Sequence, residues 1–181
     1  MQAELSDPLL EESLSGHPLL GRMPPDQREL LLERSRIREL GPAEAICREG
    51  FTPTAWFVLL EGQARITRTR PDGAQEVLAL LLPGALFGAV GLLCGERRSA
   101  TAAALETARV LEIPAELLHA ESDDLSPRLA LELREILALS LTAQLRTMNR
   151  RLVRLGRKLL GESPSEEREP EPLSGWQLPP R

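Results

Sequence analysis

The sequence predicts a mainly β domain flanked by helices, and three of its features support that prediction. Between residues 37 and 113 the chain is broken into short segments by pairs such as Gly41-Pro42 and Pro83-Gly84. Breakers at this spacing are typical of many short strands in a sandwich or small barrel. Helical patterns lie on both sides of this region, and the 181 residues, 42% of them hydrophobic, suffice for one core.

The strand region contains one clear hairpin, in the segment ARITRTRPDGAQEVLALL. Pro71 fixes a turn dihedral, Asp72 can bond its own backbone, and Gly73 accepts a positive φ. The segments WFVLLEG and ARVLEI have the Val, Leu and Ile content of buried strands. We therefore expect strands in all of these segments.

Helices are expected before and after the strands. Residues 7–38 look helical, with Asp26 and Glu29 near a helix start and Leu30 behind them. Ser126-Pro127 is a second start signal, and the pattern after it persists to about residue 160. Its upstream half is expected to pack on the β domain. Its distal half carries a heptad seam typical of a dimeric coiled coil, formed by Leu141, Leu145, Met148, Leu152, Leu155 and Leu159.

Composition excludes several classes of protein. The net charge is −5 and the isoelectric point about 5.2, so the chain as a whole lacks the cationic field of a nucleic-acid binder. Two Cys and two His in no ligand-like spacing predict neither a metal site nor a disulfide. With no P-loop and no G-x-S-x-G motif, we assign no catalytic residues and expect no enzyme.

Location follows from similar observations. The acidic N-terminus is not a signal peptide, and the low cysteine content suits a reducing compartment. The uncharged run 77–95 is broken by Pro83-Gly84 and three further glycines, which favours a strand, a turn and a loop over a membrane span. The expectation is a cytoplasmic protein.

Residues 161–181 are rich in Pro and Glu with little to bury, and we expect them to be disordered. Trp176 stands alone in this tail. Single aromatic residues in such tails can anchor the chain in a partner's groove, although an idle tail residue is an equal reading. At the other end, residues 1–17 are read as a tail that precedes the domain.

The segment FGAVGLLCGERRSA, residues 87–100, places three glycines before two arginines. Glycine lets successive N–H groups turn toward an anion, and a guanidinium can bind two phosphate oxygens. Taken alone, the segment fits a tight turn with a solvated charge better than an anion site.

The wider pattern resembles the cyclic nucleotide-binding domain of the bacterial catabolite activator (cyclic AMP receptor) family, over roughly residues 18–160. The resemblance rests on REGFTPTAWFVLLEGQARI, on LLPGALFG and on RRSAT, which resembles the end of the family's phosphate cassette. It implies a β-roll, a jelly-roll-like double-stranded β-helix, over 18–125 with leading helices. A dimerisation helix over 126–160 would follow it, without the family's helix-turn-helix domain.

The resemblance also implies roles for single residues. Arg98 would pair with the cyclic phosphate of a cAMP- or cGMP-like ligand and Ser99 would donate a hydrogen bond to it. The ribose-phosphate would be lined by Gly88, Ala89, Val90, Gly91 and Leu92. The family has Glu where this chain has Ala89, and that Glu accepts a bond from the ribose 2′-hydroxyl. Glu96 is a candidate replacement for it, or a solvated loop charge.

The long helix offers polar side chains near the implied ligand, and the candidates for base contact are Ser140, Thr142, Gln144 and Thr147. In mid-helix, such residues also commonly bond back to their own backbone. Further along, the helix carries a basic cluster, which is read as a solvated face or as a site for an acidic partner or nucleic acid. The cluster comprises Arg146, Arg150, Arg151, Arg154, Arg157 and Lys158.

Three functions remain open at this point. The first is a regulatory sensor that binds a cyclic nucleotide or related phosphate and signals through a dimerising helix to a protein partner. The second is a scaffold that has kept this fold, lost the ligand, and binds another protein through the helix and tail. The third is a transcription regulator that contacts DNA through the basic helix.

Overall fold

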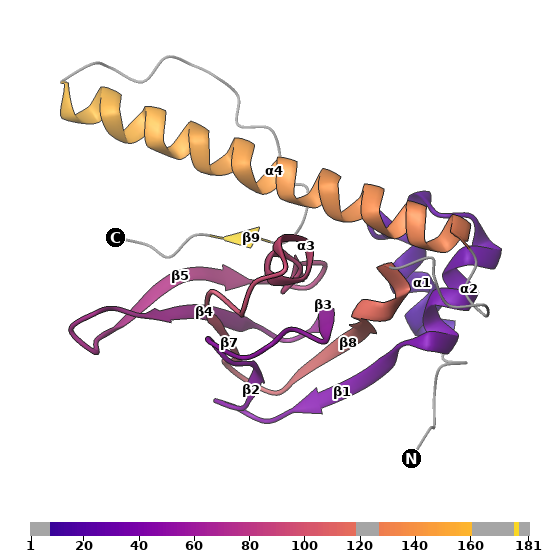
Figure 1. Ribbon diagram of the computed structural model, residues 1–181. Helices are drawn as coiled ribbons and strands as arrows, with labels where there is room; N and C mark the ends of the chain where they lie inside the picture. The colour runs from indigo at the N-terminus through magenta and orange to yellow at the C-terminus, as the bar shows by residue number, and fades with distance from the viewer. Residues whose placement is uncertain (1–7, 119–126, 161–175, 178–181) are drawn as a thin grey trace.

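The computed structural model describes residues 8–118, 127–160 and 176–177. Two antiparallel sheets form a β-roll, with strand orders β1-β8-β3-β6 and β2-β7-β4-β5-β9 (Figure 1). The strands are β1 (Arg36–Leu40), β2 (Ala45–Cys47), β3 (Ala55–Glu61), β4 (Ala64–Thr69), β5 (Gln75–Leu81), β6 (Leu86–Phe87), β7 (Thr101–Ala104), β8 (Ala108–Pro114) and β9 (Trp176–Gln177). The prediction of a mainly β domain, a roll with a long C-terminal helix, is confirmed.

The helices are α1 (Pro8–Ser15), η1 (Leu20–Arg22), α2 (Pro25–Arg34), α3 (Val90–Cys94), η2 (Ala115–Leu118) and α4 (Pro127–Leu159). Figure 1 shows α1 and α2 at the end of the roll where α4 begins. Residues 36–38, which the sequence analysis included in the helical block, lie in β1 instead. They pair with β8, from Arg36 opposite Glu112 to Arg38 opposite Val110, and the sheet overrides their local helical pattern.

The β4–β5 hairpin forms where the turn residues predict it. The strands pair from Ala64 opposite Leu81 to Thr69 opposite Gln75. Gly73 has φ of +82°, and Asp72 accepts a hydrogen bond from the backbone N–H of Ala74 at 3.0 Å. The short polar side chain and the glycine thus close the turn that the sequence indicates.

The core has two parts, separated by the four-stranded sheet. Because side chains alternate across a strand, Trp56 and Val58 of β3 face the helices. Phe57 and Leu59 face the interior of the roll. The four-stranded sheet therefore contacts the helical cluster on one face and the roll interior on the other. A shift of β3 alters the packing on both faces.

Residues 8–17 differ from the expected N-terminal tail. Leu10 and Leu14 of α1 are buried in the helical cluster. Their spacing of four places both on one face of the helix, which packs against the domain. His17, directly after α1, is also buried, so the folded domain begins at or before residue 8.

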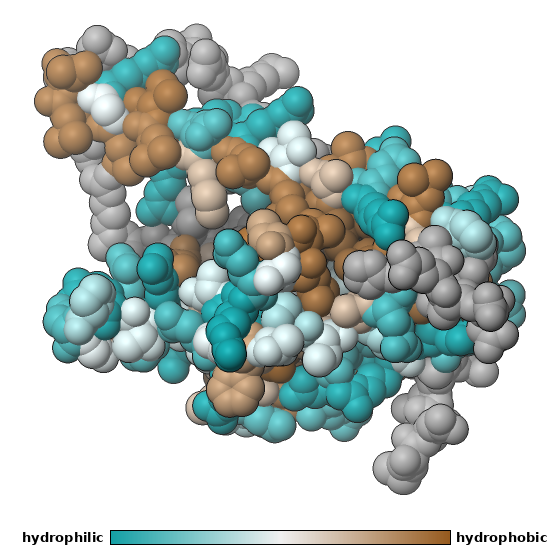
Figure 2. All heavy atoms as spheres, in the orientation of Figure 1, coloured by the Kyte–Doolittle hydropathy of each residue, from teal (hydrophilic) through white to brown (hydrophobic). Residues whose placement is uncertain are grey.

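α4 has two unlike halves. Leu129, Leu133 and Leu137 are buried against the domain, as the sequence analysis expected of the upstream half. The distal half leaves the domain, with Leu145 61% exposed and Leu152 65% exposed. Figure 2 shows hydrophobic side chains gathered over the distal end of α4.

Residues 176–177 form β9, which pairs with β5, whereas the sequence analysis predicted disorder from residue 161 onward. Residues 161–175 and 178–181 lie outside the described part of the chain. Within the described residues, no helix has the length and apolar content to cross a bilayer.

Candidate ligand site

Arg98 lies between α3 and β7, and its guanidinium points into the protein. The residue is only 8% exposed. Its Nη2 donates to the carbonyl oxygen of Ala55 at 2.6 Å, and its Nη1 donates to that of Gly88. The guanidinium also lies over the ring of Phe57, with Cζ 5.4 Å from the centroid. Arg98 is therefore held by three groups from β3 and from the end of β6.

The backbone of Arg98 is fixed by the loop after β2. Its N–H donates to the carbonyl oxygen of Phe51, and its own carbonyl accepts from Gly50, both at 2.8 Å. Gly50 has φ of +80°, which favours glycine. This pairing of two loops turns the Arg98 side chain inward.

The charge of Arg98 has no carboxylate partner within 4.0 Å in the described part of the chain. Burial lowers the pKa of Arg98, but a guanidinium keeps its proton at neutral pH. Burial likewise raises the pKa of the nearby Cys47 thiol, which therefore stays neutral and does not balance the cation. Beyond the two donors named above, its other three N–H groups have no hydrogen-bond partner among the described residues.

Position 88 has no space for a side chain and therefore requires glycine. Its φ is +80°, and a Cβ there would lie 2.8 Å from Nη1 of Arg98 and 3.0 Å from Cδ2 of Phe57. A side chain at this position would displace the guanidinium. The sequence analysis grouped Gly88 with Arg98, and the structure brings them together.

Ala89 is the N-cap residue directly before α3 and is buried in the helical cluster, 4% exposed. The position where the resembling family has Glu is therefore part of the hydrophobic core here. A carboxylate that lost its hydration at this position would cost a large amount of free energy unless it were paired. Ala89 is suited to packing and offers no hydrogen-bond acceptor from its side chain.

The glycine-rich segment forms a short helix instead of an open loop. In α3, Gly91 is buried, Leu92 is half-buried, and Val90 is 46% exposed. A Cβ on Gly91 would lie 2.8 Å from the carbonyl oxygen of Glu96, so the turn after α3 closes tightly on it. The turn is closed by the N–H groups of Leu93 and Glu96, which donate to the carbonyl oxygens of Ala89 and Gly91 at 3.0 and 2.9 Å.

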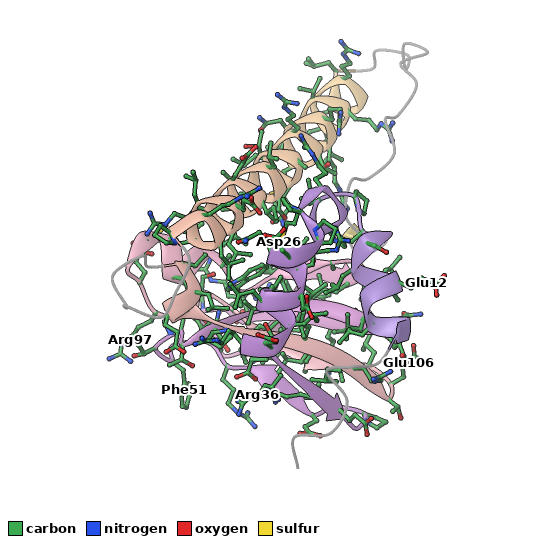
Figure 3. All side chains as sticks on the ribbon, turned by 90° about the vertical axis from the view of Figure 1, so that its right-hand side faces the viewer. Glu12, Asp26, Arg36, Phe51, Arg97 and Glu106 are labelled. Atoms are coloured by element: carbon green, nitrogen blue, oxygen red, sulfur yellow. The ribbon has the colours of Figure 1, made fainter. Side chains whose placement is uncertain are left out.

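The side chains next to Arg98 face outward. Glu96, Arg97 and Ser99 are exposed. Arg97 donates from Nη1 to the carbonyl oxygen of Gly50 at 2.8 Å. Figure 3 shows Arg97 and Phe51 projecting from the periphery of the roll. The sequence analysis preferred Arg98 to Arg97, and only Arg98 enters the protein interior.

The four polar candidates on α4 have different environments. Gln144 donates from Nε2 to the carbonyl oxygen of Leu86 at 3.4 Å and to Oγ of Ser140 at 3.2 Å. Ser140 is 2% exposed. Thr142 and Thr147 donate to carbonyl oxygens of their own helix at 2.7 and 2.9 Å, as mid-helix threonines commonly do. Of these four residues, only Gln144 bonds to β6, through the carbonyl of Leu86, the residue before Phe87.

Sequence reasoning missed Phe57, Ala55 and Cys47 as neighbours of Arg98. Phe57 also stacks on Phe87, with ring centroids 5.3 Å apart. The strand that contains Phe57 is almost uniformly apolar, so its sequence does not indicate which of its residues face Arg98. A backbone carbonyl acceptor such as that of Ala55 leaves no trace in residue type.

Comparison with known proteins gives a consistent result. Residues 37–122 match the cyclic nucleotide-binding domain family. The cyclic AMP receptor protein of Thermus thermophilus is 33% identical over 100 residues, which are 55% of this chain and 46% of that protein. The crystal structure of the catabolite activator protein of the same organism has a TM-score of 0.57 and 31% identity, covering 80% of this chain and 63% of that one.

Residues 37–122 belong to the cyclic nucleotide-binding domain family. A second relative in sequence is a cAMP-dependent protein kinase regulatory subunit of Mycosarcoma maydis, 32% identical over 96 residues, which are 53% of this chain and 18% of that protein. The chain spans less than half the length of either relative in sequence. The predicted resemblance to the catabolite activator family is confirmed, and the chain contains a regulatory domain of the cyclic nucleotide-binding type.

Proposed function

We propose that this cyclic nucleotide-binding domain is a non-enzymatic sensor that binds a cyclic nucleotide or a related phosphate ligand. The observation that carries the proposal is the buried guanidinium of Arg98, which has no carboxylate partner among the described residues. The carboxylate of Glu112 attracts this cation from beyond ion-pair distance, but a buried cation without a directly paired counter-charge remains costly. A ligand phosphate would supply that charge.

The ligand phosphate would be held by the donors that Arg98 has left and by the hydroxyl of Ser99. Two carbonyl bonds and the Phe57 ring fix the plane of the guanidinium, so it is pre-organised for an anion. Gly88 and the turn of Val90, Gly91 and Leu92 would line the ribose-phosphate. Gln144 is the α4 residue best situated to sense the ligand, because it contacts the carbonyl of Leu86 at the end of β6.

Selectivity for the ribose is expected to be weak. The Ala89 side chain cannot accept a hydrogen bond from a 2′-hydroxyl, and its burial leaves no room for a replacement at the same site. The missing bond to a charged acceptor corresponds to about 1.5–3 kcal/mol, hence roughly a ten- to hundredfold loss in affinity. Phosphate binding through Arg98 does not depend on it.

The distal half of α4 would form the dimer. Leu145, Met148 and Leu152 are 61%, 43% and 65% exposed, and the helix has no domain beneath it there. Pairing with a second copy would bury this seam. A ligand that shifts α4 through Gln144 would then change what a protein partner meets on the helix, and that partner would in turn change ligand affinity.

A ligand-free scaffold is the second candidate. The two carbonyls that hold Arg98 give its buried cation partial compensation without any ligand. In this alternative, Arg98 is a structural residue that ties β3 to the turn after β6, and Ala89 packs the core. The two functions differ in whether any phosphate ligand stabilises the folded domain.

A thermal-shift screen against cyclic mono- and dinucleotides separates the two. A ligand that binds only the folded state raises the melting temperature, by several degrees at a hundred times its Kd. The Ser99→Ala variant should reduce the shift, since Ser99 is exposed and its loss leaves the fold intact. The matched control, Arg97→Ala, should keep the shift. No shift with any ligand at millimolar concentration would favour the scaffold.

A further inference from the structure

The edge of the five-stranded sheet is formed by β5, and β9 pairs with it. The pairing is antiparallel, with Leu80 opposite Gln177 and Leu81 opposite Trp176. Among the described strands, β5 has β4 as its only neighbour apart from β9. Figure 1 shows β9 on the side of β5 that faces α4.

The edge that β5 presents is unusually unprotected. Residues 77–81 read VLALL, without a charge or a proline, and Val77 and Leu78 are 39% and 36% exposed. Sheet edges are normally blunted by charged residues, proline or bulges, or are covered by another segment. Of these devices, β5 carries the charge of Glu76 near its start and a bulge in the pairing with β4, between Ile66 and Thr67. Coverage by a strand completes the protection.

The tether from α4 is long enough to bring the tail back. Sixteen residues separate Leu159 from Trp176 and can span about 50 Å when extended. From Gln144, which contacts β6, to Leu159, α4 rises about 22 Å. A tethered segment of this kind has an effective concentration near its site of about a millimolar, so weak pairing suffices for occupancy.

The distribution of charge also favours a segment of the same chain as the strand that covers β5. The connection, residues 160–175, contains five Glu and one Arg. Residues 141–159 of α4 contain six basic residues and no acidic one. The two segments carry opposite charges and attract one another, and this attraction is screened by salt.

We propose that the outer edge of β5 is a strand-docking site and that the segment around Trp176–Gln177 of the same chain is its occupant. Main-chain hydrogen bonds supply the affinity, as in other cases of strand addition to a sheet edge. Pro179 and Pro180 lack the N–H needed to extend the pairing, which limits the docked strand to a few residues. The inference does not depend on whether the domain binds a nucleotide.

NMR-detected amide exchange on the full chain and on a chain ending at residue 160 tests the proposal. In an antiparallel pair, successive opposed couples alternate between one whose two residues exchange both hydrogen bonds and one that exchanges none, so the amide of either Leu80 or Leu81 is protected by β9. That amide should exchange at least about tenfold faster in the shortened chain. The amides of Val110 and Leu111 in the central strand β8 should not change. Equal exchange at both leucines in the two chains would overturn the proposal.

Variants separate backbone pairing from side-chain effects. The double variant Trp176→Pro/Gln177→Pro removes both N–H groups and should match the shortened chain, whereas Gln177→Ala keeps the N–H and should match the full chain. A peptide of residues 172–181 at millimolar concentration should restore protection to the shortened chain, and its double-proline form should not. Full protection in the double-proline chain, or protection that falls on dilution because a second copy supplies the strand, would contradict the inference.

Discussion

The guanidinium carbon of Arg98 lies 5.4 Å from the centroid of the Phe57 ring, and that ring stacks on Phe87 at 5.3 Å. A cation over an aromatic face gains electrostatic attraction, more so when it is desolvated. The contact joins the loop before β7 to β3 and β6. Because Phe57 also faces the roll interior, the position of Arg98 is coupled to the packing of the roll.

Replacing Arg98 should destabilise the domain even without a ligand. Arg98→Ala leaves the carbonyl oxygens of Ala55 and Gly88 without their donors, which should lower the free energy of unfolding by about 2–4 kcal/mol. Arg97→Ala, at an exposed position, should change it by less than about 0.5 kcal/mol. Urea denaturation measures both, and equal effects of the two substitutions would show that the inward contacts of Arg98 contribute nothing.

Gly88→Ala should be more damaging than a substitution at another glycine with positive φ. Gly73→Ala, in the open hairpin turn with nothing within 4 Å, carries only the backbone strain of about 1 kcal/mol. Gly88→Ala adds the close approach of Cβ to Arg98 and Phe57, so its total loss should reach about 3 kcal/mol. Thermal unfolding of the two variants gives the comparison. A loss at Gly88 no larger than at Gly73 would mean that the guanidinium is not held where the structure has it.

The domain should lose stability on mild acidification because of His17. Nε2 donates to the carbonyl of Gly84 at 2.8 Å, and Nδ1 accepts from the N–H groups of Leu19 and Leu20 at 3.1 Å, an arrangement that requires the neutral ring. Burial lowers the pKa of His17 in the folded state. The unfolded chain therefore binds the proton first, and the stability present above about pH 6.5 falls as the pH drops toward the folded pKa.

The His17→Asn variant provides the control for this pH dependence. Asn can accept the two backbone N–H bonds but does not titrate, so its free energy of unfolding should change less between pH 7.5 and 5 than that of the parent protein. The measurement is urea denaturation at several pH values. If the free energy of unfolding changed equally with pH in the two proteins, the assignment of a neutral His17 ring with hydrogen bonds at both nitrogens would be wrong.

The α4 seam predicts a dimer that depends on specific leucines. Leu152→Asp should shift the chain to a monomer in sedimentation equilibrium without lowering its melting temperature, because Leu152 is 65% exposed and outside the core. Val153→Asp, at a neighbouring position off the seam and 55% exposed, should leave the association unchanged. If both substitutions weakened association equally, general charge repulsion would be the cause. If the parent protein did not associate at all, the proposed dimer would be wrong.

The sequence predicted the order of the elements well, because the signals are local. Gly and Pro breakers marked the strands, and the Pro71 to Gly73 turn marked the β4–β5 hairpin. The long helix was also found, with its upstream half on the domain as expected. The packing of Leu10 and Leu14 was missed, because one short helix without caps resembles a tail until its partner surface is known.

The site was predicted less completely, because its contacts are distant in sequence and largely made by backbone. Arg98 was selected by its place before Ser99-Ala100, but its acceptors belong to residues 10 and 43 positions away. The substitution at Ala89 was noted from the sequence, whereas its burial in the core became apparent only in the fold. The β9 pairing was missed for the same reason, since it depends on an exposed edge far along the chain.

Isothermal calorimetry with cyclic AMP and its 2′-deoxy analogue tests the central claim most directly. We expect saturable binding of both ligands, with affinities within about threefold of each other because Ala89 offers no acceptor. Binding by Ser99→Ala or Arg98→Lys should be at least tenfold weaker. Absence of heat with either ligand at millimolar concentration, while the protein remains folded, would contradict the claim that the buried guanidinium serves a phosphate.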